Sequence, residues 1–236
     1  MTFEVCAVNI QSALAAERAG AHRIELCSAL DVGGLTPSPG LIRAAVRQLN
    51  IPVNVLIRPR EGNFLYTEDE RNIMLDDIRF CRETGANGVV VGALTAGNEL
   101  DLPLMAVMKE TAGSMEVVCH RAFDFSTDPA AALEQLVALG FKRVLSSGQA
   151  TTAWEGRFLL KTMVEKAAGR ISVMPGAGIS AKNILEIVAV TGAREFHFTG
   201  RKKVIQNSGD IPGLESWYWE SSVDAIRGII AASGGG

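Results

Sequence analysis

The chain has 236 residues, of which 47% are hydrophobic and 21% charged, and its formal net charge is −3. This composition supports a large core and excludes an intrinsically disordered chain, and the absence of a basic stripe argues against nucleic acid as the main partner. No apolar run approaches the roughly 18 residues of a membrane span, and the first residues do not resemble a signal peptide. Because the four cysteines have no scaffold-like spacing, we expect a cytoplasmic globular protein without membrane contact.

Four segments repeat one design, in which a glycine ends a helix and a few small or polar residues lead into a strand. They begin at Gly20, Gly85, Gly140 and Gly192, separated by 65, 55 and 52 residues. Glycine stops a helix well because it adopts the left-handed conformation without a Cβ clash. Each interval fits two βα units of a barrel of about 250 residues. The repeat therefore predicts eight units.

The remaining elements fall between these glycines. We expect further strands at Phe3–Cys6, Pro52–Arg58, Glu116–Arg121 and Ile171–Met174. We expect helices at Ile10–Ala19, Pro39–Leu49, Glu68–Thr84, Leu102–Ala112, Pro129–Leu139, Glu155–Ala168, Ala181–Val190 and Ser222–Ala232. Strands that alternate with helices predict a parallel α/β sheet. The count of eight favours a (β/α)₈ TIM barrel, residues 1–232 as a single domain with 233–236 as a flexible tail, over an open doubly wound sheet.

Alternation along each strand predicts which side chains enter the barrel. The inward set is unusually polar for a barrel interior, which Val, Ile and Leu normally fill. It comprises Glu4, Cys6, Glu25, Cys27, Asn54, Arg58, His120, Ser147 and His197. Polar groups at the carboxyl ends of barrel strands indicate a ligand site. The alternative is a buried ion pair of Arg58 with Glu4 or Glu25.

Six segments resemble the CutC copper-homeostasis family in order and spacing along most of residues 1–200. They are Arg23–Ser28, Gly33–Ser38, Ile57–Gly62, His120–Asp124, Leu145–Gly148 and Met174–Gly178. The resemblance implies a TIM-like barrel, a role in copper homeostasis and Cu(I) as the bound ion, with Cys6 and Cys27 at the positions of the family's proposed ligands. Thiolates suit Cu(I), which is a soft ion. Alternatively both cysteines are small core residues, as we expect for Cys81 and Cys119.

A second hypothesis is a metabolic enzyme that acts on a small anionic substrate bearing a phosphate or carboxylate. Arg58 and Arg60 flank Pro59 and could present two guanidinium groups to such an anion. Glu25 and His120 would transfer protons, and Asp124 would fix the tautomer of His120. The alternatives are an ion pair of Arg58 with Glu25 or Asp124, and a structural brace in the loop after the strand.

Substrate binding in this second hypothesis extends to Ser147, His197 and two glycines of the loop before the helix at Ala181. Gly176 and Gly178 would bind phosphate through main-chain N–H groups and the helix N-terminus, although glycines there could serve only the turn. The segment from Arg201 to Ser221 departs from the family pattern. We expect its Trp217 and Trp219 to pack this loop or a contact within a homo-oligomer.

Overall fold

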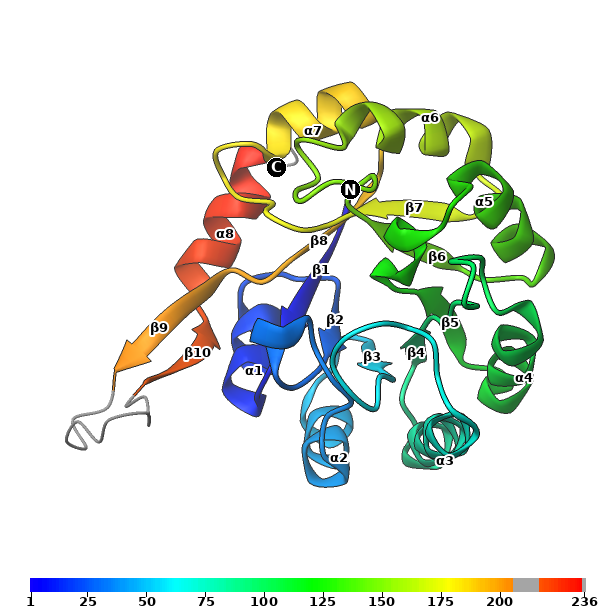
Figure 1. Cartoon of the computed structure of the whole chain (residues 1–236). Coiled ribbons are helices and arrows are strands. Elements are labelled where there is room, and N and C mark those ends of the chain that lie inside the picture. Colours follow the sequence, from blue (N-terminus) through cyan, green and yellow to red (C-terminus); the bar gives the residue numbers. More distant parts are fainter. Residues whose placement is uncertain (206–216, 235–236) are drawn as a thin grey trace, which may run out of the picture.

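Eight parallel strands form a curved sheet with the helices outside it (Figure 1) in the computed structural model, which describes residues 1–205 and 217–234. The strands are β1 Thr2–Ala7, β2 Arg23–Leu26, β3 Val53–Leu56, β4 Gly88–Val91, β5 Glu116–Cys119, β6 Arg143–Ser146, β7 Ser172–Pro175 and β8 Glu195–Phe198. They are ordered β7-β6-β5-β4-β3-β2-β1-β8, and the two end strands β7 and β8 pack against each other. This nearly closed barrel confirms the predicted fold and excludes the open sheet.

The helices surround the strands as the sequence predicts. They are α1 Ile10–Arg18, α2 Pro39–Gln48, α3 Glu68–Thr84, α4 Leu102–Ala112, α5 Pro129–Ala138, α6 Arg157–Ala167, α7 Ile184–Thr191 and α8 Val223–Ala232, with short 3₁₀ turns η1 Leu30–Val32 and η2 Arg121–Phe125. The four repeated glycines have φ between 67° and 90°, which confirms their role in ending helices. Among the described residues, no helix has the length and apolar character needed to cross a membrane.

Most helix boundaries differ from the prediction by at most two residues, and the largest difference is at the start of α7. Helix α7 begins at Ile184 rather than Ala181, because the Asn183 side chain accepts a hydrogen bond from the Ser180 N–H and donates one to the Gly178 carbonyl. These bonds hold residues 181–183 in a turn. The helix N-terminus therefore lies further from the Gly176–Gly178 loop than we expected.

The apolar core has an outer and an inner part. Side chains such as Ile24, Leu26 and Val117 pack between strands and helices in the large outer core. Inside the barrel a small cluster forms from Cys6, Cys27, Leu56, Val90 and Val118. The alternation rule is confirmed for these strands, since Cys6, Leu56, Val90 and Val118 are each flanked on both sides by residues of the outer core and Cys27 is preceded by one, Leu26.

Deeper in the barrel, at the amino ends of the strands, a network of charged side chains replaces the usual aliphatic filling. Arg23 pairs with Glu4 and Glu195, at 2.5 and 2.6 Å. Arg143 pairs with Glu195 and Glu116, at 2.8 and 2.6 Å. The expected alternative of Glu4 paired with Arg58 is wrong, since Glu4 is satisfied by Arg23. Arg23 and Arg143 are the first residues of β2 and β6. The sequence pattern assigns these positions to the turns before the strands and not to a strand interior.

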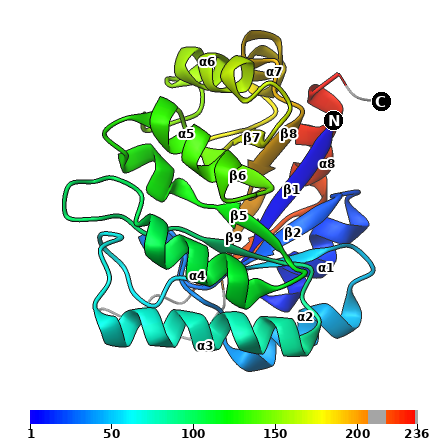
Figure 2. The ribbon, with the colours of Figure 1, turned by 90° about the vertical axis from the view of Figure 1, so that its right-hand side faces the viewer.

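A β-hairpin follows β8 and extends away from the barrel (Figure 1), and in the turned view of Figure 2 it lies behind the barrel strands. Its strands β9, Arg201–Ile205, and β10, Trp217–Ser221, pair antiparallel, and residues 206–216 lie outside the described part of the chain. The Trp219 indole donates to Asp31 at 3.0 Å and lies under the Arg201 guanidinium. Trp219 thus anchors the hairpin to the turn η1, while the homo-oligomer stays a prediction.

Ser233, the residue directly after α8, is packed against the rest of the protein. The Ser233 hydroxyl donates to the Ile230 carbonyl and its side chain is buried, so this residue belongs to the end of α8. Residues 235–236 of the expected tail lie outside the described range.

Candidate functional site

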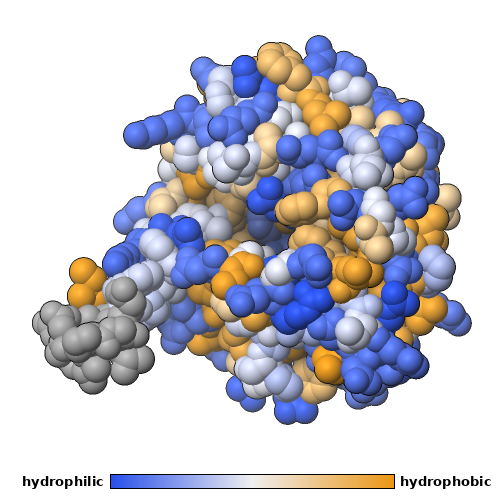
Figure 3. Space-filling view, viewed as in Figure 1, coloured by the Kyte–Doolittle hydropathy of each residue, from blue (hydrophilic) through white to orange (hydrophobic). Residues whose placement is uncertain are grey.

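A cavity of about 430 Å³ opens at the carboxyl ends of the barrel strands, where Figure 3 shows a hollow near the centre of this face. Distant segments of the chain contribute its polar lining: Cys6, Glu25, Arg58, His120, Arg121, His197, Thr199 and Arg201. Apolar lining comes from Leu30, Leu56, Phe64, Leu145 and Ile179. The structure therefore brings six of the predicted site residues together at one mouth: Cys6, Glu25, Arg58, His120, Gly178 and His197.

Two thiols lie side by side at this cavity: Cys6 is part of its lining, and Cys27 contacts Cys6 from behind the lining. Cys6 Sγ and Cys27 Sγ are 3.3 Å apart, and the two residues are 3% and 0% exposed. They meet because β1 and β2 pair with Cys6 opposite Glu25 and Ala7 opposite Leu26, and Cys27, the first residue after β2, continues the pairing by donating its N–H to the Ala7 carbonyl. The Cys27 contact, together with burial, raises the pKa of the Cys6 thiol well above its ordinary value. Without a bound metal, this thiol is protonated at neutral pH.

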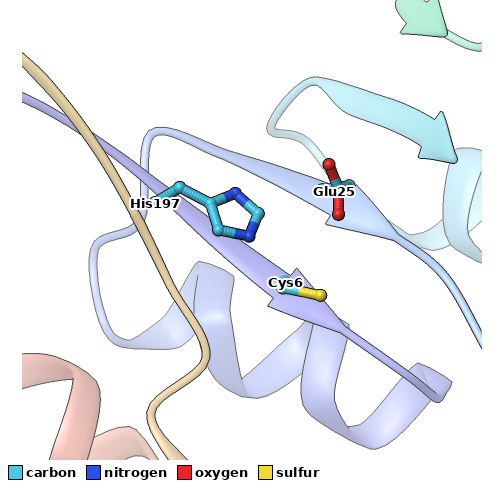
Figure 4. Close-up of side chains that lie close together, drawn as sticks. All are labelled: Cys6, Glu25 and His197. Atoms are coloured by element: carbon cyan, nitrogen blue, oxygen red, sulfur yellow. The ribbon is translucent and has the colours of Figure 1, made fainter. Parts of the chain in front are cut away.

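His197 lies beside Cys6, next to the thiol pair. Its strand pairs with β1 so that His197 stands opposite Glu4, and its Nδ1 lies 2.8 Å from Glu4 Oε1. The ligand atoms of Cys6, Glu25 and His197 all lie within 4.8 Å of one another. Figure 4 shows these three side chains, from β1, β2 and β8, directed into a common space. Sulfur, imidazole and carboxylate donors therefore converge at one point.

Charge couples the acidic and basic groups of this cluster. Burial opposes ionisation of Glu4, but the hydrogen bond from His197 and the charge of Arg23 lower its pKa to about 2. Burial also disfavours a charged His197, yet the carboxylates of Glu25 and Glu4 and the contact with Cys6 raise its pKa well above the ordinary value. Burial raises the pKa of Glu25 to about 7. Glu25 Oε2 has no hydrogen-bond partner among the described residues.

Arg58 is buried in the cavity wall, and Arg60 is not part of it. The Arg58 guanidinium donates to the carbonyls of Val32, Gly34 and Gly62, at 2.8 to 3.0 Å. Arg60 turns away to pair with Glu70 at 2.6 Å, at the start of α3. The expected pair of guanidinium forks does not form, because Glu70 and nearby main-chain carbonyls bind the second arginine.

His120 lines the cavity, but Asp124 does not orient it. The His120 Nδ1 accepts a hydrogen bond from the Ala122 N–H, since the chain turns into η2 directly after β5. Asp124 instead accepts hydrogen bonds from Arg121 and from the hydroxyl of Ser146. Asp124 thus braces the loops after β5 and β6, and the expected tautomer-fixing role is wrong.

The remaining predicted binding residues shape the site more than they line it. Ser147 is fully buried, and its hydroxyl bonds Asp124 and the Ala150 carbonyl outside the cavity lining. Gly178 lines the cavity. Gly176 provides room, because a Cβ there would lie 2.4 Å from Leu145 Cδ1 and 3.4 Å from His197 Cβ.

The sequence did not predict Phe64 as a residue of the site, and it did not predict the contact between Glu4 and His197. The Phe64 ring centroid lies 5.0 Å from that of His120 and 5.0 Å from the Arg58 guanidinium carbon. Phe64 sits in an irregular loop with no periodic pattern to indicate its direction. The contact of Glu4 with His197 follows from the pairing of β1 with β8, which a closed barrel requires.

Comparison with known proteins agrees with the motifs. A model of the CutC family matches residues 1–202. The family protein CutC of Xanthomonas campestris pv. campestris (strain B100) is 48% identical over 234 residues, which cover 98% of each chain. The family protein CutC of Xylella fastidiosa (strain 9a5c) is 45% identical over 97% of this chain and 87% of its own length.

Solved structures give the same result. The CutC crystal structure from Streptococcus agalactiae superposes with a TM-score of 0.80 at 36% identity, covering 84% of this chain and 98% of that one. Phosphoribosyl anthranilate isomerase of Thermotoga maritima, at 13% identity and a TM-score of 0.60 over 100% of this chain and 99% of its own, shares the barrel fold alone. With a matching family model over most of its length and relatives near half identity, this chain belongs to the CutC family.

Proposed function

We propose that this protein binds Cu(I) as cargo through Cys6 and Cys27, with His197 as a third ligand. The observation that carries the proposal is the pair of buried free thiols, 3.3 Å apart, of which Cys6 lines an open cavity and Cys27 lies directly behind it. Thiolates are the ligands that Cu(I) prefers, and imidazole also binds copper. Cys81 and Cys119 are buried in the outer core, away from the cavity lining, and serve packing.

The surroundings of His197 support its role as a ligand. Histidines that bind metals usually donate the second ring N–H to a carboxylate, which fixes the tautomer and the ring direction. Glu4 supplies that carboxylate at 2.8 Å from Nδ1. This leaves Nε2 to face the side of Cys6 and Glu25 (Figure 4). Metal binding would displace the protons that the thiols and the imidazole hold without it.

The family adds a second line of support. The Streptococcus agalactiae relative is described as a candidate copper homeostasis protein. The proposed site also needs reduced thiols, which a reducing cytoplasm maintains. We therefore place the protein's copper handling in the cytoplasm.

The test is an anaerobic Cu(I) titration in competition with bicinchoninate, a chelator that changes colour on binding Cu(I). Wild-type protein should retain one Cu(I) per chain against the chelator, and Cys6→Ser or Cys27→Ser should lose it. Cys119→Ser is the matched control, because it also alters a buried cysteine but leaves the cavity intact. This control should retain copper.

Two outcomes would overturn the proposal. One is stoichiometric Cu(I) retained by the Cys6→Ser/Cys27→Ser double variant. The other is Zn(II) that displaces Cu(I) at equal concentration, because two thiols with histidine and glutamate also suit tetrahedral zinc.

A further inference from the structure

The charge of Arg58 has no anionic partner in the described part of the chain. The residue is 6% exposed, and its terminal nitrogens donate to three neutral carbonyls. Its Nε–H meets no acceptor at hydrogen-bonding geometry among the described residues. The nearby Tyr66 hydroxyl, where Arg58 opposes the rise in pKa that burial causes, is likewise left without a hydrogen bond. A buried charge is costly unless it is paired. The guanidinium therefore leaves both a positive charge and one N–H group available to a ligand.

His120 presents a second donor beside this charge. Its Nδ1 accepts from the Ala122 N–H, so the proton of the neutral ring is on Nε2. That Nε2 is buried and has no partner among the described residues. Burial and the neighbouring charge of Arg58 lower the pKa of His120 to about 3, which keeps the ring neutral. The ring is thus held as a neutral donor without an acceptor.

Both donors lie against the same aromatic ring. The Phe64 centroid is 5.0 Å from the His120 ring and 5.0 Å from the Arg58 guanidinium carbon. All three residues line the cavity, whose volume of about 430 Å³ falls in the range of small-molecule sites. The ring and both donors therefore share one part of the cavity lining.

We propose that Arg58 and His120 form a binding subsite for the oxyanion group, carboxylate or phosphate, of a small organic molecule. An oxyanion supplies the missing negative charge and accepts hydrogen bonds from both free N–H groups. The apolar side chains of Leu56, Leu145 and Ile179 are placed to contact its carbon skeleton. The subsite goes beyond the proposed Cu(I) site and requires neither thiol.

The experiment uses the full chain carrying Cys6→Ser/Cys27→Ser and no copper, so that its result does not depend on the Cu(I) proposal. Inorganic phosphate and glycerol phosphate form the phosphate arm, and lactate forms the carboxylate arm. With ¹⁵N-labelled histidine, the ¹⁵N NMR signal of His120 Nε2 should shift on titration in at least one arm. The arm that binds tighter identifies the oxyanion.

Variants test the role of each donor by calorimetry. Arg58→Met should weaken binding at least about tenfold, because a hydrogen bond to a charged group is lost. Arg60→Met is the matched control, since that guanidinium lies outside the cavity lining and pairs with Glu70. It should bind the probe as before. Because Arg58 also holds three carbonyls, His120→Asn provides a second variant if Arg58→Met does not fold.

The proposal fails if neither arm shifts the His120 signal at 10-fold molar excess over millimolar protein. It also fails if His120→Asn and the folded Arg58 variant bind as tightly as Arg60→Met. Binding in one arm that is lost in His120→Asn and retained in Arg60→Met supports it.

Discussion

Glu4 and His197, which lie 193 positions apart in the sequence, are joined by a contact of 2.8 Å between Oε1 and Nδ1. The same carboxylate accepts from Arg23 at 2.5 Å through its other oxygen. Glu4 therefore connects the charge network deep in the barrel to the proposed metal ligands at its mouth. A stable network fixes the direction of the imidazole, as outer-shell carboxylates do in metal sites.

Glu4→Gln should weaken Cu(I) binding about 10- to 100-fold, because the amide no longer supplies the anionic acceptor that orients His197. Competition with bicinchoninate measures this change. Glu116→Gln is the control, since Glu116 joins the same network through Arg143 but lies at the far end. Equal losses in both variants would show that the effect comes from general destabilisation.

Arg23→Met should lower the free energy of unfolding by about 3–5 kcal/mol, because it leaves buried carboxylates without their partner. The Arg23 side chain is 6% exposed and pairs with both Glu4 and Glu195. Urea denaturation gives the difference. Arg170→Met removes an exposed pair with Glu134, which solvent screens, and should cost much less. Similar losses for the two arginines would contradict the importance of burial.

The pH dependence of stability should carry a contribution from His120. Burial and the charge of Arg58 lower the pKa of His120 from its ordinary value of 6.5 to about 3. The unfolded chain takes up a proton that the folded chain does not, so this contribution is fully present above pH 6.5 and is lost as the pH falls toward 3. The slope is at most about 1.4 kcal/mol per pH unit.

His120→Asn should therefore flatten the fall in unfolding free energy between pH 6 and pH 5. His22→Asn, which alters a more exposed histidine outside the cavity lining, should leave most of the slope. Chemical denaturation at several pH values distinguishes the variants. An unchanged slope in His120→Asn would mean that the ring is protonated in the folded protein.

Gly92→Ala should destabilise the protein by about 1–3 kcal/mol, because overpacking forces neighbouring groups to shift. A Cβ at this position would lie 2.6 Å from the His120 ring and 3.0 Å from Ala122 Cβ. Gly228→Ala in α8 meets nothing within 4 Å and should instead stabilise the helix by about 1 kcal/mol. Thermal unfolding that ranks the two variants alike would contradict this explanation.

The sequence predicts the barrel well because its information is local and repeated. Glycines such as Gly85 mark helix ends, and α3 and α4 have the predicted bounds. Alternation also places Cys6 and Cys27 inward correctly, since apolar neighbours fix which face meets the outer core. These patterns depend on period and propensity alone.

Positions further into the loops could not be predicted in the same way. The strand β3 ends at Leu56; Arg58 still lines the cavity as alternation predicts, but the pattern does not extend to Arg60. The direction of Arg60 is set by Glu70, ten residues later, and Asp124 is held by the loop after β6. These long-range hydrogen bonds determine the loops, and no local sequence signal reports them.

X-ray absorption at the copper edge tests the central claim most directly, because it identifies the atoms bound to the ion. Protein loaded with one Cu(I) per chain should show two sulfur ligands and one nitrogen ligand, and His197→Ala should lose the nitrogen while Cys119→Ser leaves the spectrum unchanged. A first shell of nitrogen and oxygen only, or sulfur ligands that persist in Cys6→Ser/Cys27→Ser, would contradict copper binding at this thiol pair.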